Sequence, residues 1–264
     1  MKVLVVGATG SIGRLAVEEA IRQGHAVRAL VRSASKSRQL ASGAEPVIGD
    51  LTRPESLSSA IDGVDAIVFT HGSDGSGKAG AEAVDYGGVR NVLAALGSRK
   101  VRVALMTSIG VTNRDSSYNR STEAHDWKRR SERLLRASGL PYTIVRPGWF
   151  DCNGSDEYKL VMLQGDKRHS GTPKDGAIAR RQLAAVLVGS LTSESADHKT
   201  FELVSARGSM QEDLDPVFAA LDADPAGSLD AVHDIANMAF DSEPERIKEE
   251  LNAIRHSQNA TVKK

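Results

Sequence analysis

Short apolar runs alternate along the chain with segments whose apolar positions recur at helical spacing. The apolar runs lie at residues 3–6, 26–31, 46–50, 65–70, 101–108, 142–148 and 200–205. The predicted helices lie at about 12–23, 54–61, 80–97, 121–138 and 178–191, and in the tail at 212–222, 228–240 and 243–256. Continuous apolar strands alternating with helices are typical of a parallel sheet covered on both faces. We therefore predict an α/β protein with a Rossmann-type doubly wound parallel sheet and right-handed crossovers.

A glycine-rich turn, GATGSIG at 7–13, separates the first predicted strand from the first predicted helix. We expect Gly7 to form the tight turn, Gly10 to let backbone N–H groups approach a pyrophosphate, and Gly13 to let the helix pack closely on the strand. The free donors and positive dipole end of the helix N-terminus also favour an anion. The predicted cofactor-binding residues of this turn are Gly7, Thr9, Gly10, Ser11, Ile12 and Gly13. The segment predicts a dinucleotide site.

The end of the second predicted strand indicates which dinucleotide is bound. An NAD site usually places an acidic residue there, to accept hydrogen bonds from the ribose 2′-hydroxyl. This chain has none, and supplies instead Arg28, Arg32, Ser33, Lys36 and Arg38. A guanidinium beside a hydroxyl suits a 2′-phosphate, which a carboxylate would repel. We predict NADP(H) as the cofactor with Arg32 as its ligand; a solvated basic loop is the alternative interpretation.

Residues that follow the other strands are further candidates, because ligands of a doubly wound sheet bind beyond the carboxyl ends of its strands. Asp50 and Leu51 follow the third strand, where the adenine would lie. The remaining cofactor-binding candidates are Thr70, His71, Gly72, Ser108, Lys128 and Pro147. Trp149 and Phe150 follow the sixth strand and either pack in the core or form the wall of a site for a flat substrate.

Four segments resemble a known family in their order and spacing: GATGSIG at 7–13, GDL at 49–51, MTSIG at 106–110 and RASGLPYTIVRPGWF at 136–150. Together they are similar to the atypical, NmrA-like branch of the short-chain dehydrogenase/reductases, over about residues 1–205. The resemblance implies a Rossmann fold, NAD(P) binding and, in catalytic members, a Ser or Thr, a Tyr and a Lys that act together on a carbonyl or alcohol. It places Ser108 at the family's hydroxyl position and Lys128 at its lysine position.

The family's tyrosine has no counterpart, because the position four residues before Lys128 is Ala124. That tyrosine would be the proton donor, with a pKa lowered by the neighbouring lysine. Three side chains are alternatives: His125 beside the vacant position, Tyr118 before the helix, and His71 after the fourth strand. We predict His125 as the third catalytic residue, with Ser108 and Lys128, because imidazole titrates nearest to neutral pH.

Composition limits the classes of partner. The 264 residues carry 34 basic and 34 acidic side chains, so the chain lacks the basic excess of a nucleic-acid binder. The segment from Glu212 to Lys264 is nevertheless acidic, with twelve acidic and five basic residues. One cysteine, Cys152, permits no intrachain disulfide and no cysteine zinc site, and we predict no metal. We expect a cytoplasmic monomer or homodimer that takes a small-molecule substrate and has neither a nucleic acid nor a membrane as a partner.

We expect three regions along the chain. Residues 1–150 form the dinucleotide-binding core, and residues 151–211 add substrate-side loops with a helix and a strand that complete the fold. Within them, the polar segment 151–176 shows no sustained period. Residues 212–264 form an acidic, mostly helical tail that caps the substrate region and frays from about Ser257. An apolar stripe at helical spacing supports its middle helix: Leu229, Val232, Ile235, Met238 and Phe240.

Three functions are compatible with these residues. The first is an NADP(H)-dependent reductase of a small conjugated or aromatic carbonyl or quinone-type substrate, for which hydride transfer needs positioning more than a strong acid. The second is a non-catalytic NADP(H)-binding protein that senses redox state and regulates a partner. The third is a tailoring enzyme of the same fold: an epimerase, dehydratase or oxygenase.

Overall fold

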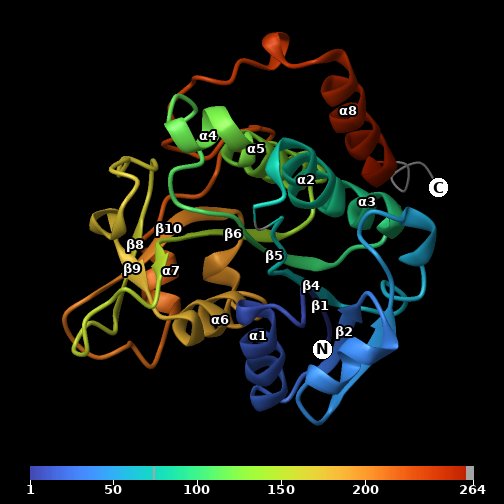
Figure 1. The fold of residues 1–264 in the computed structure, drawn as a ribbon, viewed down its shortest axis with the longest axis horizontal. Coiled ribbons are helices and arrows are strands. Elements are labelled where there is room, and N and C mark those ends of the chain that lie inside the picture. Colours follow the sequence, from blue (N-terminus) through green and yellow to red (C-terminus); the bar gives the residue numbers. More distant parts are fainter. Residues whose placement is uncertain (74, 260–264) are drawn as a thin grey trace.

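A computed structural model describes residues 1–73 and 75–259, and an eight-stranded sheet forms its centre (Figure 1). The strand order is β3-β2-β1-β4-β5-β6-β10-β8, and every neighbouring pair is parallel except β10 with β8. The strands are β1 (Lys2–Val6), β2 (Ala26–Val31), β3 (Ala44–Ile48), β4 (Ala66–Phe69), β5 (Arg102–Met106), β6 (Tyr142–Pro147), β8 (Lys159–Leu163) and β10 (Lys199–Ala206). The order reverses between β1 and β4, which is the Rossmann-type switch point. The predicted fold class is confirmed.

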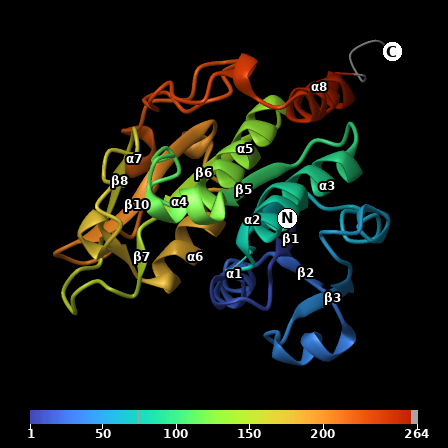
Figure 2. The same cartoon turned by 45° about the horizontal axis from the view of Figure 1, so that its top comes forward.

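Helices cover both faces of this sheet, as Figures 1 and 2 show. The helices are α1 (Ser11–Arg22), α2 (Gly77–Gly80), α3 (Gly87–Leu96), α4 (Ser117–Thr122), α5 (Ala124–Ala137), α6 (Arg180–Gly189), α7 (Asp215–Ala219) and α8 (Glu245–Asn259). One hydrophobic core lies between the sheet and α1 with α6, and a second between the sheet and α3, α5 and α8. The central strands β1, β4, β5 and β6 are buried on both faces because successive side chains point alternately into the two cores, whereas the edge strand β3 is largely exposed.

The turn between β1 and α1 is as close-packed as its glycines predict. Gly7 has a φ of +83°, and a Cβ there would lie 2.7 Å from the backbone nitrogen of His71. A Cβ on Gly13 would lie 2.0 Å from the carbonyl oxygen of Gly7. A side chain at either position would force the backbone apart, so the contact between helix and strand depends on these two glycines.

The predicted helix at 54–61 is wrong, and only a single 3₁₀ turn forms, at Pro54–Ser56. The guanidinium of Arg28, on β2, binds the C-terminal end of this segment. Its Nη1 donates to the carbonyl oxygens of Ser59, Ala60 and Asp62 at 3.0, 3.2 and 2.7 Å. These carbonyls therefore accept from an arginine side chain, and Arg28 is occupied structurally and not available to a 2′-phosphate.

Two other predicted helices are interrupted. The helix expected at 80–97 begins at Gly77 and passes through a π-helical turn, Ala81–Tyr86, before α3. The helix expected at 121–138 is two helices, because Glu123 adopts a left-handed φ of 56° between α4 and α5. A π-helical turn inside a helix is often found at a functional site.

The segment predicted to lack regular structure contains a strand. β8 pairs with β10 in antiparallel register, with Met162 opposite Leu203, and forms the edge strand of the sheet next to β10. A second, two-stranded sheet joins β7 (Trp149–Phe150) to β9 (Ala177–Ile178). Neither sheet pairing leaves a local period in the sequence, because partners far along the chain determine them.

The tail is less helical than predicted. α8 confirms the helix expected at 243–256 and continues past the predicted fraying point to Asn259, while residues 260–264 lie outside the described part. The helix expected at 212–222 is only the short α7. The helix expected at 228–240 is wrong: Met238 is buried but Ile235, three residues earlier, is 58% exposed, so the apolar residues share no helical face.

Ion pairs explain the irregular course of that segment. Asp230 accepts hydrogen bonds from Arg129 and Arg133, both buried on α5. The carbonyl oxygens of Ile235 and Met238 also accept from these guanidinium groups. Backbone groups that a helix would pair internally are thus bound to α5.

Substitution of Gly13 by alanine should destabilise the protein by about 3 kcal/mol, the upper end of the cost of overpacking. The reason is the 2.0 Å approach of the new Cβ to the Gly7 carbonyl oxygen. Urea unfolding measures the change. Gly189→Ala is the matched control, since a Cβ there meets only a side-chain carbon at 3.7 Å. Equal stability of the two variants would contradict the close packing.

Leu251→Ala on α8 should cost about 2–5 kcal/mol of unfolding free energy, the usual range for a buried leucine. Leu251 is 1% exposed and belongs to the core that α3 and α5 share. Glu249→Ala, at an exposed position of the same helix, should change the stability by less than about 0.5 kcal/mol. A loss as small for Leu251 would mean that α8 docks without contributing to the core.

Candidate functional site

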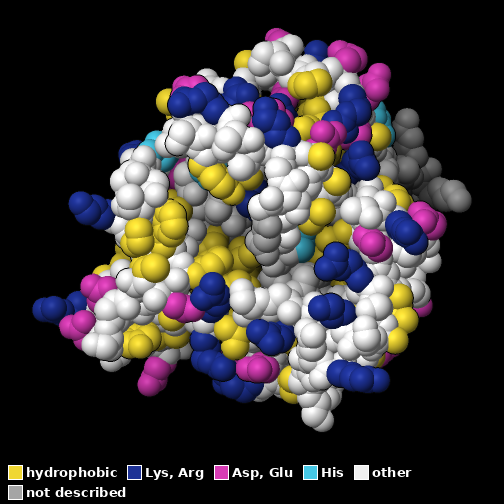
Figure 3. Space-filling view, in the orientation of Figure 1, with side chains coloured by type: hydrophobic (Ala, Val, Ile, Leu, Met, Phe, Trp, Pro, Cys, Tyr) yellow, Lys and Arg dark blue, Asp and Glu magenta, His cyan; other side chains and the backbone are white. Residues whose placement is uncertain are grey.

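The carboxyl ends of β1, β4, β5 and β6 meet at one edge of the sheet, and this edge carries most of the predicted site. The space-filling view shows the corresponding face hollowed near its centre, with hydrophobic side chains inside and Lys and Arg side chains around it (Figure 3). α1 begins there at Ser11 with no side-chain cap and no acidic residue in its first turn. Its N-terminal amides are thus suited to an anion such as a pyrophosphate.

The residues of the glycine turn differ in exposure. Gly10 and Ser11 are exposed and Thr9 is partly exposed, whereas Ile12 is buried in the α1 side of the core. The predicted contact of Ile12 with a cofactor would therefore be through its backbone. Gly7 packs against the residues that follow β4, because a Cβ on Gly7 would meet the backbone of His71.

Arg32 and Asp50 lie together beyond β2 and β3. Arg32 is exposed at the end of β2. The Asp50 carboxylate accepts from the backbone N–H and the hydroxyl of Thr52 at 2.9 and 2.8 Å, and these hydrogen bonds, with the nearby charge of Arg32, lower the pKa of Asp50. Leu51 accepts a 2.6 Å hydrogen bond from the side chain of Asn91 at its carbonyl oxygen, which fixes this loop on α3.

The predicted residues after β4 have separate roles. Thr70 is structural, since its hydroxyl donates to the Val6 carbonyl oxygen at 2.9 Å. His71 Nε2 lies 3.0 Å from the carbonyl oxygen of Val84, while its Nδ1 is buried with no hydrogen-bond partner among the described residues. Burial lowers the pKa of His71 to about 4, so the ring is neutral at physiological pH. Gly72 is exposed beside it.

Lys128 reaches from α5 to the π-helical turn. Its Nζ donates to the Asp85 carboxylate at 2.8 Å, and the same carboxylate accepts 2.6 and 3.2 Å hydrogen bonds from the hydroxyl and backbone N–H of Ser73. An ammonium has three donors, so this ion pair orients Lys128 without exhausting its capacity. The π-helical turn thus positions the predicted lysine.

Ser108 and His125 lie on either side of the loop after β5. The hydroxyl oxygen of Ser108 and the Nδ1 of His125 are both buried, and neither has a hydrogen-bond partner within residues 1–73 and 75–259. A Cβ on Gly110 would touch the His125 ring at 3.4 Å, which places the ring against this loop. Burial lowers the pKa of His125, so its imidazole is neutral near pH 7. Buried polar atoms without partners are uncommon and indicate a place for a ligand.

The remaining candidates are the position of the missing tyrosine, the substitute Tyr118, and Pro147 and Trp149 at the end of β6. Ala124 is buried in the core, so the vacant position has been filled by packing. Tyr118 is 54% exposed, with its ring centroid 5.1 Å from that of His125. Pro147 is buried, and its carbonyl oxygen accepts from the Ile109 N–H at 3.0 Å. Trp149 is 41% exposed and so is not a core residue.

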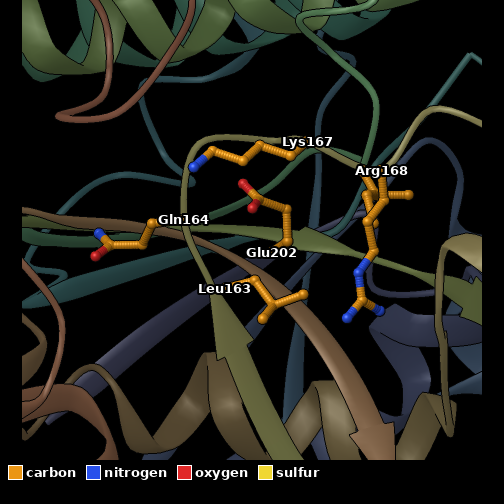
Figure 4. Close-up of a pocket in the computed structure, with 6 residues that line it drawn as sticks. Leu163, Gln164, Lys167, Arg168 and Glu202 are labelled. Carbon is orange, nitrogen blue, oxygen red and sulfur yellow. The ribbon is translucent and has the colours of Figure 1, made fainter.

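A cavity of about 190 Å³ adjoins the site, and four of its six lining residues lie in the segment 151–176, where we expected substrate-side loops (Figure 4). Its walls are Ile109, Leu163, Gln164, Lys167, Arg168 and Glu202. Ile109 directly follows Ser108, so the cavity opens at the β5 end of the site. The sequence carried a signal for Glu202, which is a lone carboxylate in the middle of the apolar run TFELVS; buried charges are rare unless paired.

Two properties of the described residues bear on partners. No helix in this part of the chain is long and apolar enough to cross a membrane. No group of three or more His, Cys, Asp or Glu side chains within it is arranged to hold a metal ion.

Comparison with known proteins agrees with the site geometry. A family model described as NAD(P)H-binding matches residues 7–194. A Bacillus subtilis protein named as the uncharacterized sugar epimerase YhfK is 31% identical over 219 residues, 81% of this chain and 99% of that protein. Sanguinarine reductase of Eschscholzia californica is 28% identical over 245 residues, 78% of this chain and 89% of that enzyme.

A solved structure from Bacillus halodurans, provisionally named an NAD-dependent epimerase/dehydratase, superposes with a TM-score of 0.69 at 26% identity, covering 84% of this chain and all of that one. Because the family match spans more than half of the residues and includes the glycine turn, the domain binds a nicotinamide dinucleotide. The chain therefore belongs to the NAD(P)H-binding family, in agreement with its resemblance to the atypical, NmrA-like short-chain dehydrogenase/reductases.

Proposed function

We propose that this protein is an NADP(H)-dependent reductase of a small conjugated or aromatic carbonyl or quinone-type substrate. The observation that carries the proposal is the pair of buried polar atoms, Ser108 Oγ and His125 Nδ1, which have no hydrogen-bond partner among the described residues and lie at the sheet edge to which the glycine turn belongs. Polar atoms held without partners beside a dinucleotide turn fit a substrate oxygen that supplies the missing hydrogen bonds. The name of one relative, sanguinarine reductase, favours the same class of reaction.

The residues fit the cofactor in this proposal. The amides at Ser11 and Ile12 would bind the pyrophosphate, because they lie at the N-terminus of α1, which has no side-chain cap, whereas the Gly10 N–H already donates to the Gly7 carbonyl oxygen at 2.9 Å and Gly10 would contribute the close approach of its backbone. The remaining proposed cofactor contacts are Gly7, Thr9, Gly13, Arg32, Asp50, Leu51, Thr70, His71, Gly72, Ser108, Lys128 and Pro147. Thr70 and Pro147 would make their contacts through the backbone, since the Thr70 hydroxyl already donates to Val6 and the Pro147 side chain is buried.

The reduced nicotinamide supplies a hydride, and the chain's own residues position the acceptor. Ser108 would donate a hydrogen bond to the substrate oxygen, and Lys128, oriented by Asp85, would bind the nicotinamide ribose. His125 would orient the substrate as a neutral imidazole, because burial lowers its pKa and leaves little imidazolium at pH 7. Trp149 would form one wall, as its exposure allows.

One observation favours a second function. Ala124 occupies the family's tyrosine position and is buried in the core, so the standard proton donor is absent. A non-catalytic, redox-sensing NADP(H)-binding protein would need no donor. The relatives named as epimerases favour a third candidate, a tailoring enzyme such as an epimerase, dehydratase or oxygenase. In each case we place the protein in the cytoplasm, as a monomer or homodimer with a small-molecule ligand.

Arg32→Ala should raise the Kd for NADPH by about tenfold or more, because a charge-assisted hydrogen bond contributes about 1.5–3 kcal/mol, and should leave the Kd for NADH within twofold. Fluorescence titration measures both constants. Arg207→Ala removes the same charge at an exposed site paired with Asp156, and should change neither constant. Equal affinity of the unaltered protein for the two cofactors would contradict the preference.

The reaction itself is tested by mixing the purified protein with NADPH and a panel of quinones, flavins, enones and aromatic aldehydes. We expect steady-state loss of the reduced nicotinamide absorbance with at least one conjugated acceptor. Ser108→Ala should lower kcat by about 10-fold or more, the loss of one oxyanion-type hydrogen bond being at least that large, with NADPH affinity retained. Tight NADPH binding without turnover on any acceptor would favour the redox-sensing protein.

A further inference from the structure

Glu202 is the acidic side chain among the six residues that line the cavity beside Ser108. It projects from β10, and its carboxylate forms part of the cavity wall together with Lys167 and Arg168, which follow β8 (Figure 4). Figure 4 shows the Lys167 side chain passing over the Glu202 carboxylate. A buried carboxyl group that also lines a cavity can exchange a proton with a bound molecule, which a carboxyl group enclosed by protein cannot do.

The carboxylates that bind Arg146 outnumber its single positive charge. The guanidinium of Arg146 faces three carboxylates: Glu132 on α5, Asp234 in the C-terminal segment, and Glu202. Glu132 and Asp234 each take two of its hydrogen bonds, at 3.0 and 2.7 Å and at 2.7 and 2.7 Å. Glu202 receives one, at 3.3 Å. Of the three it is the least compensated.

The groups on the other side of Glu202 add to this imbalance. Asp166 donates its backbone N–H to Glu202 Oε2 at 3.0 Å, but its own carboxylate lies nearby, anchored by Gly110 and Thr112. Burial, first, and the charges of Asp166 and Asp234 raise the pKa of Glu202 to about 7, against the opposing effect of Arg146. Arg136 is directed to Glu132 and Asp224 instead.

We propose that Glu202 is the proton donor of the reductase, taking the place of the family's tyrosine from the wall of the cavity that Ile109 also lines. This inference rests on the proposed reductase function and names the group that completes it. Each Glu202 oxygen accepts one hydrogen bond from the protein and has a second lone-pair direction on which a proton can be carried.

Reduction of a conjugated carbonyl substrate requires one hydride transfer to carbon and one proton transfer to oxygen. The carbonyl carbon receives a hydride, two electrons with one hydrogen nucleus, from the reduced nicotinamide, which leaves oxidised. The π electron pair of the C=O bond moves to the oxygen, and that oxygen forms a bond to the proton as the Glu202 O–H bond breaks. Glu202 is left as a carboxylate and regains its proton from solvent through the cavity. The product is the alcohol.

Glu202→Gln tests the proposal with two acceptors that differ in their need for a proton. 4-Nitrobenzaldehyde requires one at oxygen, whereas N-methylacridinium accepts a hydride at carbon and becomes neutral without one. We expect kcat for the aldehyde to fall about 10²-fold in the variant, the usual contribution of a general acid, and the acridinium rate to stay within twofold. The unaltered protein should lose aldehyde activity as pH rises through about 7, and the variant should not show this fall.

Asp234→Asn is the matched control, because Asp234 also binds Arg146 but is not part of the cavity wall. If Glu202 acted only by holding Arg146, both variants would lose the two activities equally, and the proposal would be overturned. A pH fall that persists in Asp234→Asn but moves to lower pH, because the charge of Asp234 helps to raise the pKa of Glu202, supports the donor role when the loss of aldehyde kcat is less than tenfold. Unchanged aldehyde kcat and pH profile in Glu202→Gln would overturn the donor role and leave the reductase function intact.

A measurement without substrate separates the two hypotheses further. Because the folded-state pKa of Glu202 is raised above that of the unfolded chain, its contribution to stability is complete below about pH 4.5 and is lost as pH rises through about 7. The urea midpoint should therefore fall between pH 5 and pH 8 by more in the unaltered protein than in Glu202→Gln. Equal pH dependence would overturn the titration of Glu202. If the unaltered protein binds NADPH and reduces neither acceptor, the donor role fails together with the reductase function, whatever the urea result.

Discussion

The guanidinium of Arg146 is the interaction on which the arrangement of this protein depends. It is fully buried at the carboxyl end of β6 and binds carboxylates from α5, β10 and the C-terminal segment. Glu132, one of these partners, also accepts a 2.8 Å hydrogen bond from Thr107, directly before Ser108. Because removal of one partner from a buried ion pair costs about 3–5 kcal/mol, these four elements and the β5 loop are held in one geometry.

The acidic excess of the tail has its explanation in the same region. Asp224 accepts from Arg136, Asp230 from Arg129 and Arg133, and Glu243 from Arg130 and Arg133, all of them arginines of α5. Residues 224–243, which precede α8, are therefore held by charge pairing and not by an apolar helical face. The same segment contacts the loop that follows Ser108, since Asn237 donates to the Thr112 carbonyl oxygen at 2.9 Å.

The sequence predicted the features that are local. The glycine turn, the parallel strands and α8 leave periods or fixed spacings, and each was found where expected. It failed where distant partners decide: β8 exists because β10 pairs with it, and residues 228–240 follow α5, whose arginines bind their carbonyl groups. For the site, the positions of Ser108 and Lys128 could be predicted from spacing, but the cavity and the charge environment of Glu202 arise only when β6, β8 and β10 meet.

The loss of the tyrosine and the surplus of carboxylates are connected. A tyrosine at position 124 would project from the first turn of α5, next to His125, whereas Ala124 is now packed in the core behind it. A reductase with this α5 needs an acid from another element, and burial of three carboxylates around one guanidinium leaves one of them able to hold a proton near neutral pH. That carboxyl group is the one that reaches a cavity beside Ser108. The network that holds the fold together thus also generates the acid that the site lacks.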